Sequence, residues 1–286
     1  ETSMRSAFVN VLLAQEMIEL RREQLILAER SAKETARLVK AARSSQVEQT
    51  RAQLDVKQQR FALQQAEREL TTAKSILASL WGELEDVQFN VAGKVVLLQD
   101  TPNFATLASK LTETAALARY YAEKRTREAA LDLEHARATP DIQAFAGSRY
   151  FNQEDGNIGF VAGIQVPWPL FDRNQGNIRT AGAQLRAVEH KREAVRRELL
   201  INLNQAYQQL LGAQADAAII QSELLPASEA TWRDTEKGYK QGQFTQLAVL
   251  ESRRALFEVR EAYLDALRRY GTAQAQIKAL TQPANL

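Results

Sequence analysis

The sequence predicts a mainly α protein that contains two copies of a long antiparallel coiled-coil hairpin, with one β-hairpin between them. Three observations predict this fold class. The chain opens with two stretches free of helix-breaking residues, their pattern returns about 200 residues later, and two short strand-like segments lie between the copies. Glycine and proline account for only 12 and 6 of the 286 residues, as long helices require.

The first hairpin is predicted from two helical stretches, residues 5–41 and 46–80. Each would be roughly 50 Å long at about 1.5 Å per residue. The polar run Ala42-Arg43-Ser44-Ser45 between them is typical of a tight turn. In the second stretch, apolar residues at three- and four-residue spacing predict a narrow coiled-coil seam, formed by Leu54, Phe61, Leu63, Ala66, Leu70, Ala73, Leu77 and Leu80.

The second hairpin is predicted by internal duplication. The run that begins at Ala7 aligns with the run that begins at Ala206, an offset of 199 residues, and Gln46 and later positions align with Gln246 and its successors at an offset of 200. A very long helical region runs from about Gly176 to Gly238, and Pro226 within it should kink or interrupt the helix. The counterpart of Gly176 in the first copy would precede the first residue, so we expect the chain to be N-terminally truncated.

The segment between the two copies has a different character. Residues 87–96 are rich in β-branched residues, and apolar and polar side chains alternate at their start, which predicts a short strand with a turn. Pro102 then opens a modest helix, and a longer helix runs to about residue 138. After Pro140, residues 141–151 and 157–168 have the pattern of two strands, joined by a linker of turn-forming residues at 152–156.

The second of these strands has one continuous apolar face. Its other face is smaller and more polar, with Gly159, Val161, Gly163 and Gln165. Two strands alone are marginally stable in water, and a wide apolar face suits a lipid-facing strand of an oligomeric β-barrel. The alternative is a hairpin that lies on the helices of a soluble protein. The predicted membrane-facing residues are Ile158, Phe160, Ala162, Ile164, Val166 and Trp168.

Composition argues against several other classes of function. The 37 basic and 35 acidic residues are interspersed, so no basic stripe indicates a nucleic-acid partner. Cysteine is absent, and His135 and His190 have no second ligand at a suitable spacing, so we expect neither a metal site nor a cofactor. No nucleotide-binding loop or catalytic constellation is recognisable. The sequence therefore predicts that the protein has no catalytic residues and is not an enzyme.

Several motifs resemble those of a known family. The run Leu170-Phe171-Asp172-Arg173-Asn174-Gln175-Gly176-Asn177 follows the second strand, after Pro167-Trp168-Pro169. The pairs Leu225-Pro226 and Gly238-Tyr239, with Gly242, stand before the second tip, and Arg51-Ala52-Gln53-Leu54-Asp55 follows the first. In this order and spacing they resemble the TolC-type outer-membrane efflux factors, most closely the CzcC-like heavy-metal branch. The resemblance covers residues 6–280.

The resemblance implies how the chain is divided. Residues 1–82 would form the first periplasmic helical hairpin, whose upper part is missing, and 83–118 an equatorial segment around a periplasmic tunnel. A helix at 119–139 would lead to the barrel hairpin at 140–170. The second periplasmic hairpin would comprise 171–282, followed by a tail at 283–286.

The resemblance also implies a function and its partners. The protein would be the outer-membrane channel of a tripartite efflux system in a Gram-negative bacterium, a passive conduit for divalent heavy-metal cations that extends into the periplasm. Its partners would be two further copies in a homotrimer, a periplasmic adaptor protein, an inner-membrane pump of the RND type and outer-membrane lipid. The alternative is a soluble periplasmic coiled-coil adaptor or scaffold.

Two candidate sites follow from the resemblance. In the family, acidic residues after the second tip narrow the tunnel, and here only Glu251 is acidic, since Ala248 stands at the other position. Three copies of Glu251 would form a cation-attracting constriction; the alternative is a solvated helix charge beside Arg253 and Arg254. The helical tips would dock the adaptor, the alternative being plain turns without a partner. Their residues are Arg43, Ser44, Ser45, Tyr239, Gln241, Gly242, Phe244 and Leu247.

Overall fold

The computed structural model describes residues 2–83, 89–95, 97, 101–151, 157–167 and 171–283. The chain divides into two compact units. The first comprises Glu1–Ser109 and Ile201–Gln282, and the second comprises Lys110–Leu200 and Pro283–Leu286.

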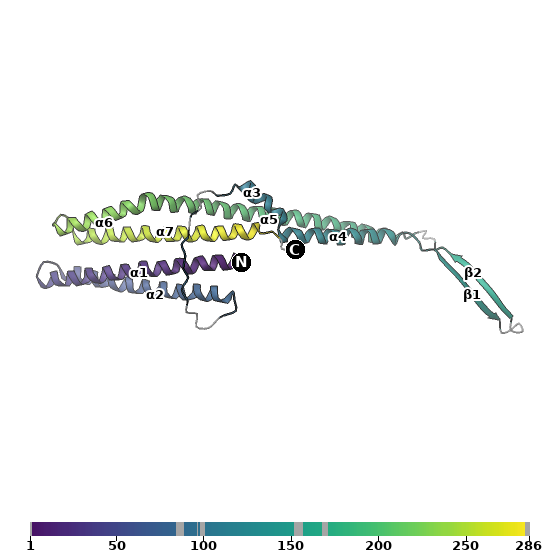
Figure 1. Ribbon diagram of the computed structural model, residues 1–286, viewed down its shortest axis with the longest axis horizontal. Coiled ribbons are helices and arrows are strands. Elements are labelled where there is room, and N and C mark those ends of the chain that lie inside the picture. The colour runs from purple at the N-terminus through teal and green to yellow at the C-terminus, as the bar shows by residue number, and fades with distance from the viewer. Residues whose placement is uncertain are drawn as a thin grey trace. The chain divides into compact units, whose positions relative to one another are not determined.

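The described elements are mainly helical, as predicted (Figure 1). In chain order they are α1 (Thr2–Lys40), α2 (Gln46–Ser79), α3 (Phe104–Lys110), the 3-10 turn η1 (Leu111–Glu113), α4 (Ala115–Ala136), β1 (Gln143–Phe151), β2 (Asn157–Gln165), α5 (Gln175–Ile219), the π-helical turn η2 (Ile220–Leu224), α6 (Leu225–Lys240) and α7 (Gln246–Thr281). No described helix is both long enough and apolar enough to cross a membrane.

In the first unit, α1 and α2 lie side by side as one hairpin, and α6 and α7 as another (Figure 1). The predicted seam of α2 is only partly correct. Ala66 and Leu77 are buried in it, whereas Leu54 and Phe61 are 55% and 63% exposed. Ala52 and Ala66 are 14 positions apart, close to four helical turns, so they share the face towards α1, while Leu54 and Phe61 lie nearly half a turn away from it.

Both hairpin tips adopt one backbone geometry, although only the second has a glycine. Ala42 and Gly242 both have left-handed φ angles, 56° and 76°. In each tip the following N–H donates to a helical carbonyl five residues back, from Arg43 to Leu38 and from Gln243 to Gly238, both at 2.8 Å. This is the hydrogen bond of a Schellman motif.

Ala42 adopts the left-handed conformation at an energetic cost, because its Cβ crowds the backbone there. Replacing Ala42 by glycine is expected to raise the free energy of unfolding by about 0.5–1 kcal/mol. Thermal unfolding followed by circular dichroism measures this change. Ala41→Gly is the control, because Ala41 has no positive φ and glycine there should destabilise. Equal effects of the two substitutions would contradict the strain at Ala42.

The helix of the second hairpin is interrupted just before Pro226, as predicted. The π-helical turn η2 precedes α6, and the N–H of Leu225 donates to the carbonyl of Ile220, five residues back. Proline has no N–H to donate, and its ring collides with the carbonyl four positions earlier in a regular helix. The wider π-helical turn accommodates both conditions, so it interrupts the regular α-helix between α5 and α6.

The segment after α2 is not the strand that the sequence predicted. Residues 89–95 are irregular, and the rest of the predicted strand, 87, 88 and 96, lies outside the described residues. The segment is held by Gln15 of α1, whose side-chain amide donates to the carbonyl of Val91 and accepts from its N–H, both at 2.9 Å. A side chain therefore supplies the hydrogen bonds that a neighbouring strand would have provided.

The same segment also packs on both hairpins. Phe89 and Val91 contact a buried cluster of Ala7, Val11 and Leu77. Val95 and Leu97 contact a second cluster, whose buried members are Leu13, Ala217, Ile220, Ala266 and Leu267. Residues 89–95 and 97 thus join the two hairpins of the first unit through apolar contacts.

In the second unit, α4 packs against the first half of α5. Lys124 forms an ion pair with Glu189 at 3.0 Å, and the guanidinium of Arg192 stacks over the ring of Tyr121 at 4.7 Å. β1 and β2 form a two-stranded antiparallel sheet in which Gln143 pairs with Gln165 and Tyr150 with Ile158. Both predicted strands are therefore confirmed, and their observed ends lie within three residues of the predicted ones.

Candidate functional site

The second tip presents two exposed apolar side chains. Phe244 and Leu247 are 49% and 51% exposed, and Gln241 and Gly242 beside them are also exposed. The ring of Phe244 lies against Gly238, where an added Cβ would come within 2.3 Å of a ring carbon. Gly238 therefore allows the aromatic ring to fold back over the end of α6.

The first tip is polar and is held by a capping box. The Ser45 hydroxyl accepts from the Glu48 N–H at 3.2 Å, and the Glu48 carboxylate accepts from the Ser45 N–H at 3.3 Å. The hydroxyl of Ser44 also donates to this carboxylate. The hydrogen bond from Ser44, followed by that from Ser45, lowers the pKa of Glu48. Arg43 and Ser45 remain exposed, so this tip offers polar groups where the second offers apolar ones.

The two tips lie close together. Burial raises the pKa of Tyr239 on α6, and the negative charges of Glu34 on α1 and Glu48 on α2 raise it further. The side-chain amide of Gln246, the first residue of α7, donates to the hydroxyl of Thr35, which is fully buried on α1. The predicted tip residues are thus brought onto one end of the first unit, while their role in docking stays a prediction.

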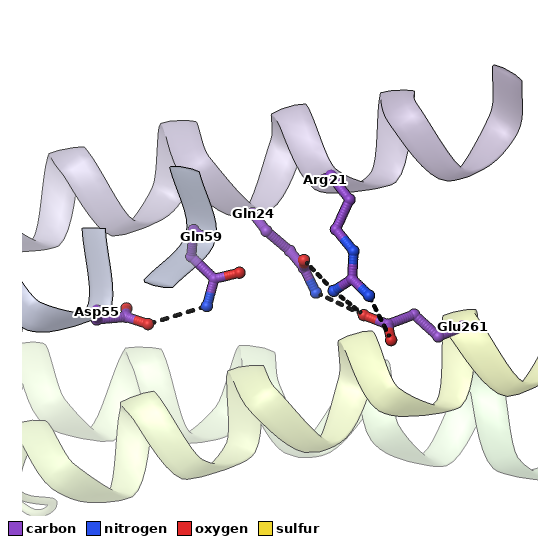
Figure 2. A network of polar contacts seen from close by, with 5 residues as sticks. All are labelled: Arg21, Gln24, Asp55, Gln59 and Glu261. Carbon is purple, nitrogen blue, oxygen red and sulfur yellow. Dashed lines mark hydrogen bonds and ion pairs between the residues drawn. The ribbon is translucent and has the colours of Figure 1, made fainter. Parts of the chain in front are cut away.

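A polar network joins the two hairpins further from the tips (Figure 2). Arg21 and Gln24 extend from α1 towards Glu261 of α7. Arg21 donates to both carboxylate oxygens of Glu261, one of them at 3.0 Å, and Gln24 donates to Glu261 at 3.1 Å. Gln24 is 92% buried and Arg21 also donates to its side-chain oxygen, so the three groups satisfy one another.

A second link connects α2 to α7. Arg253 forms an ion pair with Asp55 at 2.5 Å, and the side chains are only 12% and 18% exposed. The amide of Gln59 donates to the other oxygen of the Asp55 carboxylate at 3.0 Å (Figure 2). Because both charges are largely removed from water and hydrogen-bonded, this pair contributes more to the hairpin contact than a surface pair would.

Glu251 lies on the exposed side of α7, one turn before Arg254. It lines a cleft of about 500 Å³ between α2 and α7, together with Arg51 and Arg254. Its neighbour Arg253 is turned to Asp55 instead. The structure thus places Glu251 in a cleft of mixed charge, and its role in a constriction stays a prediction.

An apolar stripe on α2 is exposed. It consists of Val47, Leu54 and Phe61, which are 60%, 55% and 63% exposed. Seven residues separate each from the next, so they form one row along the helix, as in a coiled-coil seam. We call this row the α2 stripe.

The β-hairpin has the predicted apolar face. Ile158, Phe160, Ile164 and Val166 are 66%, 92%, 73% and 46% exposed, and Ala162 is exposed beside them. Trp168, which completes the predicted row, lies outside the described residues. Exposed apolar side chains in such a row mark a surface that another molecule or lipid covers.

Sequence reasoning missed the links between the hairpins. Arg253 and Asp55 are 198 residues apart in the chain, and Arg21 and Glu261 are 240 apart. In the sequence, these ion pairs are indicated only by charged residues that lie close to the apolar seam of each helix. Among the described residues, no group of three or more histidine and acidic side chains is placed to hold a metal ion.

Residues 107–281 match the family described as Outer membrane efflux protein. The chain is 31% identical over 261 residues to the cobalt-zinc-cadmium resistance protein CzcC of Cupriavidus metallidurans. That alignment covers 91% of this chain and 62% of the resistance protein, so the chain spans less than two thirds of the relative's length.

Solved structures share the fold. A membrane protein from Pseudomonas aeruginosa superposes with a TM-score of 0.80 at 18% identity, covering 99% of this chain and 66% of that one. The outer membrane protein VceC from Vibrio cholerae superposes with a TM-score of 0.79 at 15% identity, covering 99% of this chain and 69% of the other.

Proposed function

Since the chain belongs to the outer membrane efflux protein family, whose members are export channels of the outer membrane rather than enzymes, we propose that it is the conduit component of a tripartite efflux system. The observation that carries the proposal is the family match over residues 107–281, which takes in both strands and the whole second hairpin. The same match favours a conduit over a soluble periplasmic adaptor. The long helical hairpins would extend from the outer membrane into the periplasm.

The cargo proposed is divalent heavy-metal cations. The support is the identity to a protein named for cobalt, zinc and cadmium resistance. A conduit needs no resident metal site, because the inner-membrane pump would supply both the energy and most of the selectivity. Specific binding would instead slow release.

The proposed assembly is a homotrimer, and the α2 stripe supports it. A row of apolar side chains at heptad spacing is the contact surface of a coiled coil. Within one copy this row is largely exposed, with Leu54 at the cleft between α2 and α7, so it is available to a neighbouring copy. The apolar strand face would in turn be covered by outer-membrane lipid in a β-barrel shared by the three copies.

The tips are proposed to dock the periplasmic adaptor, which would itself contact the inner-membrane pump. Phe244 and Leu247 would enter apolar positions of the adaptor, while Arg43 and Ser45 would make polar contacts. Glu251 is proposed to form a ring of three carboxylates that attracts cations at the periplasmic entrance, although Arg51 and Arg254 in the same cleft offset part of this charge.

Complementation tests the proposal. The full-length gene would be expressed in a bacterium that carries a cobalt-zinc-cadmium pump and its adaptor but lacks their outer-membrane component. We expect zinc and cobalt resistance to return and cellular zinc, measured by mass spectrometry, to fall. The control is a gene without residues 140–170, which should fail to reach the outer membrane. Outer-membrane insertion of the full-length protein without any metal resistance would refute the proposed function.

A further inference from the structure

The β-hairpin has a second face, opposite the exposed apolar one. Residues paired across antiparallel strands share a face, and successive residues of one strand alternate between the two faces. The register places Ser148 with Phe160 on the apolar face, so the odd-numbered residues of both strands lie on the other. The pairs on this second face include Gln143 with Gln165, Phe145 with Gly163, and Gly147 with Val161.

On this second face the aromatic ring of Phe145 lies over its cross-strand partner, Gly163. A Cβ added at Gly163 would come within 2.6, 3.0 and 3.3 Å of three carbons of that ring. A side chain at position 163 would therefore need the space that the ring occupies. Glycine lets the ring rest against the backbone of β2, which is how aromatic residues cover glycines in sheets.

The backbone itself does not call for glycine at position 163. Gly163 is not among the residues with a positive φ angle, so its conformation is open to any amino acid. Gly147 lies on the same face and also has no positive φ, yet a Cβ added there would meet nothing within 4 Å. The contact with Phe145 is thus what distinguishes Gly163 from the other glycine.

The Phe145–Gly163 pair lies near the end of the sheet that is joined to the helices. The strand β1 follows α4 and begins at Gln143, and β2 ends at Gln165 and is followed by α5. Each member of the pair is two residues from that end. If the apolar face contacts lipid, which rests on the proposed function, the pair lines the barrel interior where the barrel continues into the helical tunnel.

We propose that Gly163 holds the ring of Phe145 against the barrel wall and thereby keeps the interior wide at this end. Phe145 is 52% exposed, so one side of the ring faces the open side of the sheet. A side chain at position 163 would push the ring away from the strand and into the path of the exported cation. Residues on the interior face of a membrane barrel tune what passes through it, and each copy in the assembly would contribute one such ring.

Single-channel conductance of the full-length protein in planar bilayers tests this proposal. Gly163→Ala should lower the conductance, and the loss should be greater in tetraethylammonium chloride than in potassium chloride, because a narrower path hinders a bulkier cation more. Gly147→Ala adds the same methyl group to the same face without meeting the ring, and is the matched control, expected to conduct as the wild type does.

A double variant shows whether the ring causes the effect. Gly163→Ala combined with Phe145→Ala should conduct as Phe145→Ala does, since no ring is left to displace. If Gly163→Ala alone does not insert into the membrane, the additional Phe145→Ala substitution should restore insertion. An insertion defect that persists without the ring, or a channel that conducts as the wild type despite Gly163→Ala, overturns the proposal.

Thiol labelling tests the assignment of the two faces. The 286 residues contain no cysteine, so Phe145→Cys and Ala146→Cys compare adjacent positions on opposite faces. With the full-length protein in lipid vesicles, a charged, membrane-impermeant thiol reagent should label position 145 and leave position 146 unlabelled. Equal labelling, or preferential labelling of position 146, overturns the interior placement of the ring.

The failure of this proposal is distinguishable from the failure of the proposed function. A wild-type channel that conducts, with the same conductance after Gly163→Ala, overturns the role of Gly163 alone. A wild-type protein that inserts but conducts no ions overturns the conduit function, and the role of Gly163 with it.

Discussion

Replacing Arg253 by alanine is expected to lower the free energy of unfolding of the paired hairpins by about 2 kcal/mol. Breaking a buried ion pair costs about 3–5 kcal/mol. We expect a smaller loss here because the two side chains are still 12% and 18% exposed to water. The loss arises mainly because Asp55 remains, largely buried, with only Gln59 as a partner. Urea denaturation followed by circular dichroism measures the change.

Two further variants make this prediction specific. Arg254→Ala removes a positive charge from the adjacent, exposed position. It should change the free energy of unfolding by less than about 0.5 kcal/mol. Arg253→Ala combined with Asp55→Ala should recover part of the loss, since no unpaired charge then remains. If Arg253→Ala and Arg254→Ala have equal effects, the ion pair with Asp55 does not hold α7 against α2.

Hydrogen exchange shows where the loosening occurs. In Arg253→Ala, amides in the first turns of α7 should exchange faster, whereas those near Tyr270 should change little, because that side chain is fully buried. The links through Thr35 and through Glu261 flank the Asp55 pair on either side. Each is expected to limit how far the opening spreads along α7.

If the proposed homotrimer forms, replacing Phe61 by aspartate is expected to abolish it while leaving the single chain folded. Burying a phenylalanine side chain contributes about 1.5–3 kcal/mol, and an aspartate in its place would bring three unpaired charges into the assembly. Within one copy Phe61 is 63% exposed, so the helical content should not change. Mass measurement in detergent by light scattering distinguishes the trimer from the monomer.

Phe61→Leu is the matched control, because it keeps an apolar side chain in the α2 stripe and should retain the trimer. Leu54→Asp, one heptad earlier in the stripe, should weaken assembly as well. A trimer that survives both aspartate substitutions would show that the stripe faces solvent or another partner in the assembled protein.

Much of the fold was predictable because it is encoded locally. Helix length follows from the scarcity of glycine and proline, and the turn after Lys40 from a run of polar residues. The strand boundaries and the apolar face of β2 follow from alternation, which the backbone of any strand imposes. The break before Pro226 follows from a missing N–H. Each of these depends on residues within a few positions of one another.

Two expectations about local structure did not hold, for identifiable reasons. The strand expected at 87–96 needed a neighbouring strand, and the side chain of Gln15 serves the described residues instead. The seam assigned to Leu54 and Phe61 needed knowledge of where α1 lies, because three- and four-residue spacing fits more than one face of a helix. In both cases the local structure depended on the element that packs against the segment, and not on the segment's own sequence.

By itself, the sequence determined that the protein consists of two long helical hairpins and a strand pair with one apolar face. The tertiary structure alone decided which charged residues of those helices meet. Arg253 pairs with Asp55 across 198 residues of chain and Arg21 with Glu261 across 240, because the packing of the hairpins sets their relative height and rotation. A charge on an isolated helix has no preferred partner at that distance. Only the packed arrangement removes water from it and makes the choice of partner matter energetically.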